Sequence, residues 1–383
     1  MITKISNGRI IAGERIIEGK SIYFCNGVIT AVTEDDLPFD TNIDAGGNFV
    51  SAGFIDLHTH GALGGDFADG DIKTIVSAAN FHCAHGTTTI FPTTLSASAK
   101  ALDSALCALK EAVSGGEILP TVAGAHLEGP YFSKNQCGAQ NPDFITPPVK
   151  KDYIALLQKH SDIIARWSFA PELEGSEEFV EDLNKFGVIS SIGHTDATYD
   201  DVMAVYNKGC RLITHFYSCT STMTRRNAFR IMGVVESGYL LDDMAVEAIA
   251  DGCHILKDLF RLLYKIKGAD NICLVTDSMS CCGIDREVAS IGGVPCKIKN
   301  GVAYLMDESA FAGSIATADR LVRFCYKTVG IDIANTIKMI TETPARVMGL
   351  DKKGKIQKGF DADIVIFDDD INIKNVFAKG KQV

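Results

Sequence analysis

The chain has no long hydrophobic run and no excess of positive charge. Its 383 residues include 48 acidic and 37 basic side chains, and the net charge is −11. Binding to nucleic acid or to an anionic membrane requires clustered Lys and Arg, so we expect neither partner. No stretch approaches the apolar length of a membrane span. A small anionic substrate is still compatible with this composition where basic residues gather locally.

The chain also has neither a signal-peptide pattern nor a disulfide framework. The first residues, MITKISNGRIIAGERI, contain no continuous apolar region and no cleavage site. The 12 cysteines are scattered along the chain, and a protein of this length does not need disulfides to hold its core. We therefore expect reduced thiols in a cytoplasmic protein. The adjacent Cys281 and Cys282 are expected to fill space in the core rather than to serve redox or metal chemistry.

Strand and helix patterns alternate through the middle of the chain. Eight short apolar runs each end on a polar residue, and stretches with helical spacing separate them. Eight such units match the closed (β/α)₈ TIM-like barrel, whereas an open doubly wound sheet usually has fewer strands. We place this α/β barrel at residues 51–345. The runs are GFIDLHTH, TTTIFPTT, VAGAHLEG, ARWSFAPE, VISSIGHT, RLITHFYS, AVEAIADG and NICLVTDS.

The two ends of the chain have a different pattern from the middle. Residues 1–50 and 346–383 contain short β-prone stretches separated by Gly and Asn turns, without a helical period. Chain termini often lie close together in space. We therefore predict that the two ends pair into one small β-sandwich domain.

The polar residues that end the barrel strands form a candidate metal site. His58 and His60 are two residues apart, so on a strand their side chains share a face. The carboxyl ends of all eight strands converge on one mouth of a barrel. Any single histidine of this kind could be an ordinary hydrogen-bonded core residue, but burying the whole set without a partner would be costly. The candidate ligands are His58, His60, Glu128, His194, His215 and Asp277.

The chemical type of these ligands indicates the metal and the reaction. Histidines with carboxylates, and no cysteine at these positions, suit one or two divalent ions, Zn²⁺ or Fe²⁺, with positions left open for water. Asp277 is either a plain ligand or a general base that takes a proton from a metal-activated water and returns it to a leaving amine. The sequence therefore indicates a metal-dependent enzyme.

Seven motifs in this chain resemble the amidohydrolase superfamily in identity and order. They also resemble, more narrowly, the N-acetylglucosamine-6-phosphate deacetylases. HLEGP and GHTDA are specific to the deacetylase group, whereas HxH marks only the superfamily. The fourth strand lacks the Lys that hydantoinase-like relatives carbamylate, and Glu128 would take its metal position. The motifs are HTHG, HLEGP, GHTDA, THFYS, ADGCH, VTD and AGS.

The resemblance implies a role for each matching residue. Glu128, His194 and His215 correspond to the metal ligands that the family always uses. His58 and His60 correspond to the additional ligands of members with two metal ions, and Asp277 to the catalytic acid–base. The implied reaction is hydrolysis of the acetamide of N-acetylglucosamine 6-phosphate to glucosamine 6-phosphate and acetate.

The resemblance also implies a substrate pocket and a homodimer. His254 and Arg226 correspond to the pair that binds the sugar phosphate, one or both reaching from a neighbouring subunit. Arg225 and Arg230 flank Arg226, so the register of this loop is open. The residues expected to line the sugar pocket are Ala139, Gln140, Ser218, Cys219, Phe311, Ala312 and Gly313.

Two departures from the family pattern keep alternatives open. The family commonly has His where this chain has Gln140, and Asn-Ala where it has Ser218-Cys219. A neutral Gln amide stabilises an oxyanion less than an imidazolium does. The alternatives are a deacetylase of another N-acetylhexosamine phosphate or N-acyl compound, and a metal-dependent sugar-phosphate-binding protein without turnover.

Overall fold

Eight parallel strands form a barrel at the centre of the computed structural model, which describes all residues 1–383. Neighbours along the chain pair in order, and a short additional strand, β12 (Thr121–Val122), pairs with β11. The eight runs predicted from the sequence are confirmed. They are β8 (Phe54–Thr59), β11 (Thr87–Thr94), β13 (Ala125–Glu128), β14 (Ile164–Phe169), β15 (Ile189–Ile192), β16 (Leu212–Ile213), β19 (Ala245–Ala248) and β20 (Ile272–Leu274).

Backbone hydrogen bonds between the first and last strand regions close the barrel at its carboxyl end. The Asp277 amide donates to the His58 carbonyl over 2.8 Å, and the His60 amide donates to the Ser278 carbonyl over 2.8 Å. These two bonds place His58, His60 and Asp277 side by side, although more than 200 residues separate Asp277 from the two histidines in the chain. The closure of the barrel therefore builds part of the site.

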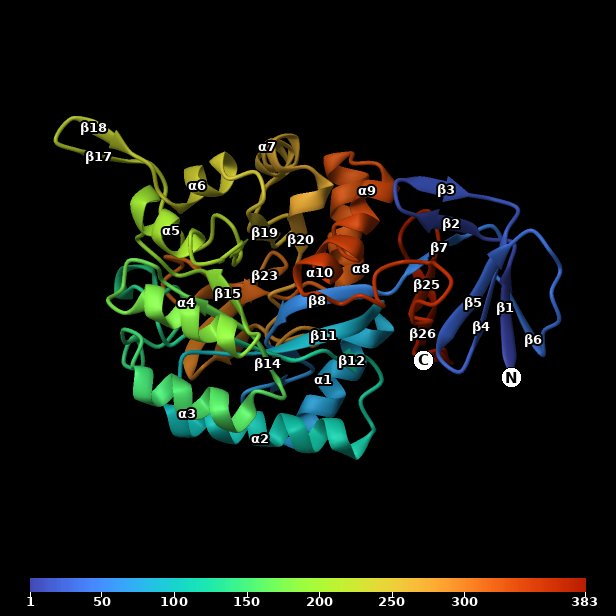
Figure 1. Ribbon diagram of the computed structural model, residues 1–383, viewed down its shortest axis with the longest axis horizontal. Coiled ribbons are helices and arrows are strands. Elements are labelled where there is room, and N and C mark those ends of the chain that lie inside the picture. Colours follow the sequence, from blue (N-terminus) through green and yellow to red (C-terminus); the bar gives the residue numbers. More distant parts are fainter.

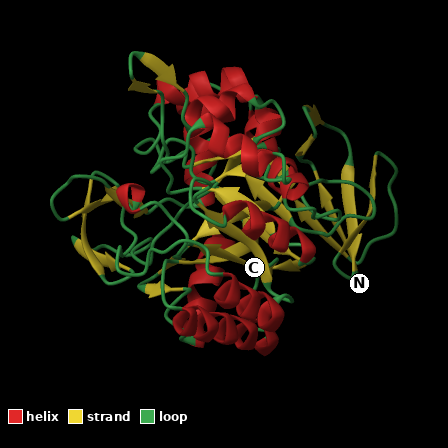
Figure 2. Ribbon diagram, turned by 60° about the vertical axis from the view of Figure 1, so that its left-hand side comes forward, coloured by secondary structure: helices red, strands yellow, loops and turns green.

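Helices pack around the outside of the barrel strands, which are consequently buried on both faces (Figure 2). The Ser98 side chain caps α2 by accepting from the Ala101 amide. The helices are α1 (Ile72–Ala84), α2 (Ala99–Gly115), α3 (Lys150–His160), α4 (Ser176–Lys185), α5 (Tyr199–Tyr206), α6 (Val234–Leu240), α7 (Lys257–Lys267), α8 (Ala318–Arg323, continued by a π-helical turn, Phe324–Val329), α9 (Ile333–Lys338) and α10 (Glu342–Val347).

Both chain ends contribute to a small β domain at one end of the molecule (Figure 1). One sheet has the order β5-β4-β1-β6, and the other has the order β27-β26-β25-β7-β2-β3. Strands β7 and β25 pair antiparallel, so the N- and C-terminal segments share a sheet as predicted. The strands are β1 (Ile2–Ser6), β2 (Arg9–Ala12), β3 (Arg15–Ile17), β4 (Ser21–Cys25), β5 (Val28–Thr33), β6 (Thr41–Asp44), β7 (Phe49–Ala52), β25 (Ile364–Phe367), β26 (Ile373–Ala378) and β27 (Lys381–Gln382).

The expected residue limits of the barrel (51–345) and of the β domain (1–50 with 346–383) stay a prediction. Thirteen buried apolar residues, among them Ile22, Ile364 and Phe377, form a hydrophobic cluster of this β domain. The expected boundary between residues 345 and 346 falls inside α10.

None of the helices combines the length and the apolar character needed to cross a bilayer.

Three strand insertions on the barrel were not predicted. Strands β17 (Thr224–Arg226) and β18 (Phe229–Ile231) form a hairpin that projects beyond the helices (Figure 1). A pair of two-residue strands, β9 (Gly61–Ala62) and β10 (Gly65–Asp66), follows β8. A four-stranded antiparallel sheet contains β21 (Val288–Ile291), β22 (Val294–Lys299), β23 (Val302–Leu305) and β24 (Phe311–Ser314). The last of these strands reaches the mouth of the barrel.

Candidate active site

The six predicted metal ligands meet at the carboxyl end of the barrel. His58 lies in β8 and Glu128 ends β13, while His194, His215 and Asp277 follow strands β15, β16 and β20 within three residues. All six are buried. They form two groups whose ligand atoms lie within 4.8 Å of one another, namely His58, His60 and Asp277, and Glu128, His194 and His215.

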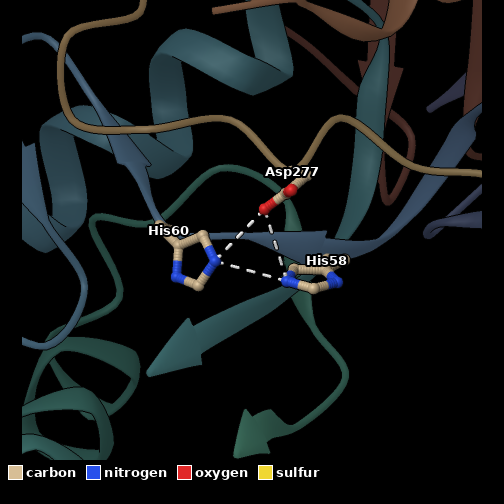
Figure 3. A group of neighbouring side chains, drawn as sticks. All are labelled: His58, His60 and Asp277. Atoms are coloured by element: carbon tan, nitrogen blue, oxygen red, sulfur yellow. Dashed lines mark hydrogen bonds and ion pairs between the residues drawn. The ribbon is translucent and has the colours of Figure 1, made fainter. Parts of the chain in front are cut away.

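The first group is centred on one carboxylate oxygen of Asp277 (Figure 3). Asp277 Oδ1 lies 3.2 Å from His60 Nε2 and 3.4 Å from His58 Nε2. The two Nε2 atoms are 3.3 Å apart. Two imidazole nitrogens and one carboxylate oxygen thus point at one small volume, as the ligand atoms of a metal ion do.

Glu128 connects the second group to the first. Its Oε1 atom lies 2.9 Å from His215 Nε2 and 3.1 Å from His194 Nε2. Its Oε2 atom lies 3.4 Å from His60 Nε2. Burial alone would raise the pKa of the Glu128 carboxyl, but His58, His194 and His215 hold that pKa well below its usual range. Glu128 is therefore an ionised carboxylate that lies between the two groups, with Oε1 also 3.5 Å from His58 Nε2.

Hydrogen bonds on the far side of the imidazoles show that this donor set fits a divalent cation. His194 Nδ1 lies 2.8 Å from the Gln136 carbonyl, and His215 Nδ1 lies 3.1 Å from the Ser218 carbonyl. A carbonyl oxygen only accepts, so each Nδ1 carries a proton and donates it. The Nε2 lone pairs are then free to face the centre, which is the arrangement of metal-bound histidines.

Three of the predicted ligands adopt a left-handed backbone conformation. The φ angles are +47° at His194, +25° at His215 and +46° at Asp277. Residues other than glycine rarely adopt such angles, and they cluster at functional sites where the surrounding structure holds them. At each of these positions the turn directs the side chain into the mouth of the barrel just as the strand ends.

A buried ion pair beneath the ligands was missed in the sequence. The Glu247 carboxylate accepts from His58 Nδ1 over 3.2 Å and from the His215 amide over 3.2 Å. Arg166 pairs with the other oxygen of Glu247, and also donates to Thr214 Oγ1 over 2.9 Å. Burial opposes ionisation of Glu247, but Arg166 and His58 lower its pKa to about 2. Glu247 therefore fixes the orientation of a ligand from each group.

The sequence did contain a signal for this pair. Arg166 lies in the fourth apolar run and Glu247 in the seventh. A charged residue inside a strand buried on both faces requires a partner. Two such residues of opposite charge in one barrel indicate an ion pair, although the spacing does not show which ligands it supports.

A cavity of about 290 Å³ opens above the ligands. Eight of the nine residues predicted to contact substrate lie in its wall, whereas Arg226 does not. Leu95, Tyr217 and Ile291 add an apolar part that was not predicted. The eight are Ala139, Gln140, Ser218, Cys219, His254, Phe311, Ala312 and Gly313.

The two residues predicted to bind phosphate lie in different surroundings. His254 is held by Asp251, whose carboxylate accepts from His254 Nδ1 over 2.9 Å, and its ring lies 4.7 Å from that of Phe311. Arg226 lies on the exposed hairpin β17–β18, away from the cavity wall of its own chain. The structure of the single chain therefore does not bring Arg226 together with His254.

The barrel and the ligand set together define a metal-dependent amidohydrolase type of site. Residues 49–383 match the model of the amidohydrolase family. The N-acetylglucosamine-6-phosphate deacetylase of Haemophilus influenzae is 32% identical over 88% of this chain and 87% of its own length. The chain therefore belongs to the amidohydrolase family and, within it, to the N-acetylglucosamine-6-phosphate deacetylases.

Solved structures agree with this membership over the whole chain. The deacetylase of Pasteurella multocida matches with a TM-score of 0.93 and 27% identity, covering 100% of both chains. A variant of the Mycobacterium smegmatis deacetylase, solved in complex with N-acetyl-D-glucosamine 6-phosphate, matches with a TM-score of 0.91 and 26% identity, covering 100% of this chain and 98% of its own.

Proposed function

We propose that this protein hydrolyses the acetamide of N-acetylglucosamine 6-phosphate and releases glucosamine 6-phosphate and acetate. The observation that carries the proposal is the convergence of Glu128, His194, His215 and Asp277 on the floor of one cavity. The relatives of this chain are deacetylases of this sugar phosphate by name, and they match over nearly its full length. One or two divalent ions, Zn²⁺ or Fe²⁺, would be held by the two ligand groups.

A bound divalent ion would polarise the acetamide carbonyl and lower the pKa of a coordinated water. Asp277 supplies the proton transfers. Burial would raise the pKa of its carboxyl, but His58 and His60 hold that pKa below its usual range. A bound cation would likewise favour the carboxylate form, so Asp277 would start the reaction ionised, accept a proton from the attacking water, and return it to the amine as the C–N bond breaks.

We further propose that the substrate phosphate is bound by His254 from the cavity wall and by Arg226 from the hairpin of a second subunit. The hairpin carries three arginines, Arg225, Arg226 and Arg230, and it projects away from its own barrel (Figure 1). Arginine binds phosphate through two parallel hydrogen bonds. The protein would then act as a homodimer, with each cavity completed by its neighbour.

The test is acetate release by the purified protein loaded with Zn²⁺ or Fe²⁺. N-acetylglucosamine 6-phosphate should be turned over much faster than free N-acetylglucosamine, the 6-phosphate of N-acetylmannosamine, or an N-acetyl amino acid. Metal analysis of the same sample gives the number and identity of the ions. Faster turnover of any of the three comparison compounds would assign a different substrate, and absence of turnover of all four would favour a binding protein.

A further inference from the structure

Gln140 makes two short hydrogen bonds at the edge of the ligand groups. The residue is 4% exposed. Its Nε2 atom donates to Glu128 Oε2 over 2.7 Å, and its Oε1 atom accepts from the Ser96 amide over 2.7 Å. The amide of Gln140 is thus engaged at both ends by protein atoms.

The Ser96 contact fixes which way the Gln140 amide faces. A backbone N–H can only donate, so the oxygen of Gln140 must lie toward Ser96. The NH₂ group is then forced toward Glu128. A flipped amide would set two donors against each other at Ser96 and two acceptors against each other at Glu128.

The contact with Gln140 gives the two Glu128 oxygens different neighbours. Oε1 lies nearest to His194 and His215 and is 3.5 Å from His58 Nε2, while Oε2 lies between Gln140 and His60 and contacts neither His194 nor His215. A carboxylate can bind two metal ions only if its plane is held so that each oxygen faces a different one. A donor on Oε2 restricts rotation about the last side-chain bond of Glu128, and Oε2 keeps a second lone pair for a metal ligand bond.

We propose that Gln140 is a positioning residue that turns Oε2 of Glu128 toward the group of His58, His60 and Asp277. It thereby selectively strengthens binding of a second metal ion at this group. The proposal rests on the metal dependence of the proposed function, but not on the identity of the substrate. It differs from the role expected from the sequence, in which Gln140 contacts the substrate.

Titration of the metal-free protein with Zn²⁺ against a competing chelator tests this without substrate. Gln140→Met keeps the length of the side chain and removes its donor. Loss of a group that orients a metal ligand typically weakens binding about 10–100-fold. We expect that loss for the weaker Zn²⁺ equivalent and a change below about threefold for the tighter one. His60→Ala identifies which equivalent belongs to the group of His58, His60 and Asp277.

Three further variants complete the design. Gln140→His restores an N–H donor and should recover at least part of the lost affinity. Gln158→Met is the matched control, since it makes the same change at an exposed position of α3. It should bind both equivalents as the wild type does. If Gln140→Met does not fold, Gln140→Asn, which is too short to make both hydrogen bonds, should show the same selective loss.

Several outcomes would overturn the proposal. They are a wild-type protein that binds a single equivalent, an equal loss of both equivalents in Gln140→Met, and unchanged Zn²⁺ binding in that variant. If Gln140→Met binds metal as the wild type does but has a raised KM for the sugar phosphate, Gln140 contacts the substrate instead. Failure of the proposed function is seen separately, as absence of acetate release by wild-type protein that binds both ions.

Discussion

Asp277 is the residue on which turnover should depend most directly. Asn has nearly the same shape but cannot accept a proton and return it, and general acid–base catalysis contributes about 10²–10⁴-fold in rate. We expect Asp277→Asn to lower kcat by at least about 10²-fold while the fold and most metal at Glu128, His194 and His215 remain. Steady-state kinetics with metal analysis of the same samples test this. Activity within a few-fold of the wild type would remove Asp277 from the mechanism.

Glu247 should matter for stability as well as for the metal site. Glu247→Gln leaves the fully buried Arg166 without its counter-charge, and breaking a buried pair in this way costs about 3–5 kcal/mol. We expect a clearly lower free energy of unfolding and weaker Zn²⁺ binding. Glu308→Gln is the control, because that carboxylate is partly exposed and pairs with Lys297 at the surface. An equal effect of the two substitutions would show that the buried pair has no special role.

At the residue scale, the metal ligands could be predicted from the sequence better than the residues that orient them. His58 and His60 could be identified because a polar residue that ends an apolar run is conspicuous, and the strand period places both on one face. Glu247 is 189 residues from the His58 ring that it orients, so local pattern carried no information about that contact. The positive φ angles of His194, His215 and Asp277 also depend on the closed barrel.

At the element scale, the strands of the barrel could be predicted, whereas the strands inserted in its loops could not. The barrel strands read as apolar runs because helices cover them outside. The hairpin of β17 and β18 is exposed over almost its whole length, so Thr224–Ile231 shows no alternation of polar and apolar residues. The sheet of β21–β24 changes in exposure from strand to strand, since β21 is largely exposed and β24 is largely buried, so its sequence shows no single period.

The hairpin gives a prediction about substrate affinity. Arg226→Ala should raise KM for N-acetylglucosamine 6-phosphate strongly and leave slow turnover of free N-acetylglucosamine nearly unchanged. Loss of one partner from a buried charged hydrogen bond costs about 2–5 kcal/mol. Arg15→Ala replaces an exposed arginine of β3 and is the control. It should leave KM and turnover of both sugars unchanged. An equal response of both sugars to Arg226→Ala would contradict a contact with phosphate.

The packing of α3 against α4 gives a prediction about pH. Asp182 of α4 accepts from Tyr153 over 2.9 Å and pairs with Lys150 and Lys185. Burial opposes its ionisation, but these partners lower the pKa of Asp182 from 3.8 to about 2. A carboxyl with a lowered folded-state pKa adds stability above its unfolded pKa, near 4, and loses it as pH falls toward 2.

The matching experiment compares the wild type with Asp182→Asn. The wild type should have the higher free energy of unfolding at pH 6, and the difference should shrink as the pH falls below about 4. Loss of bound metal in acid affects both proteins and cancels in the comparison. A difference that stays constant between pH 6 and pH 3 would show that Asp182 acts by packing alone.

At the scale of the whole molecule, the site exists only when the complete barrel has formed. The ligands come from five strand regions that span residues 58–277, and β24, from the inserted sheet, supplies one wall of the cavity. No single strand–helix unit contains a complete ligand group. The fold class could be predicted because this repetition is visible in the sequence. The cavity could be predicted only through the family resemblance, because its wall is built mainly from loops of irregular sequence.

Removal of metal should therefore destabilise the whole barrel rather than one loop. A ligand that binds only the folded state at about 100 times its Kd adds about 2.7 kcal/mol per site. In domains of about 150–250 residues, 1 kcal/mol corresponds to roughly 2–4 °C in Tm, so we expect stripping with a chelator to lower Tm by several degrees. Returning Zn²⁺ should restore the original value. The double variant His194→Ala, His215→Ala should start with a lower Tm and respond much less to the chelator. Equal shifts in the wild type and the double variant would show that the stabilising ion binds elsewhere, and the assignment of Glu128, His194 and His215 as its ligands would then be wrong.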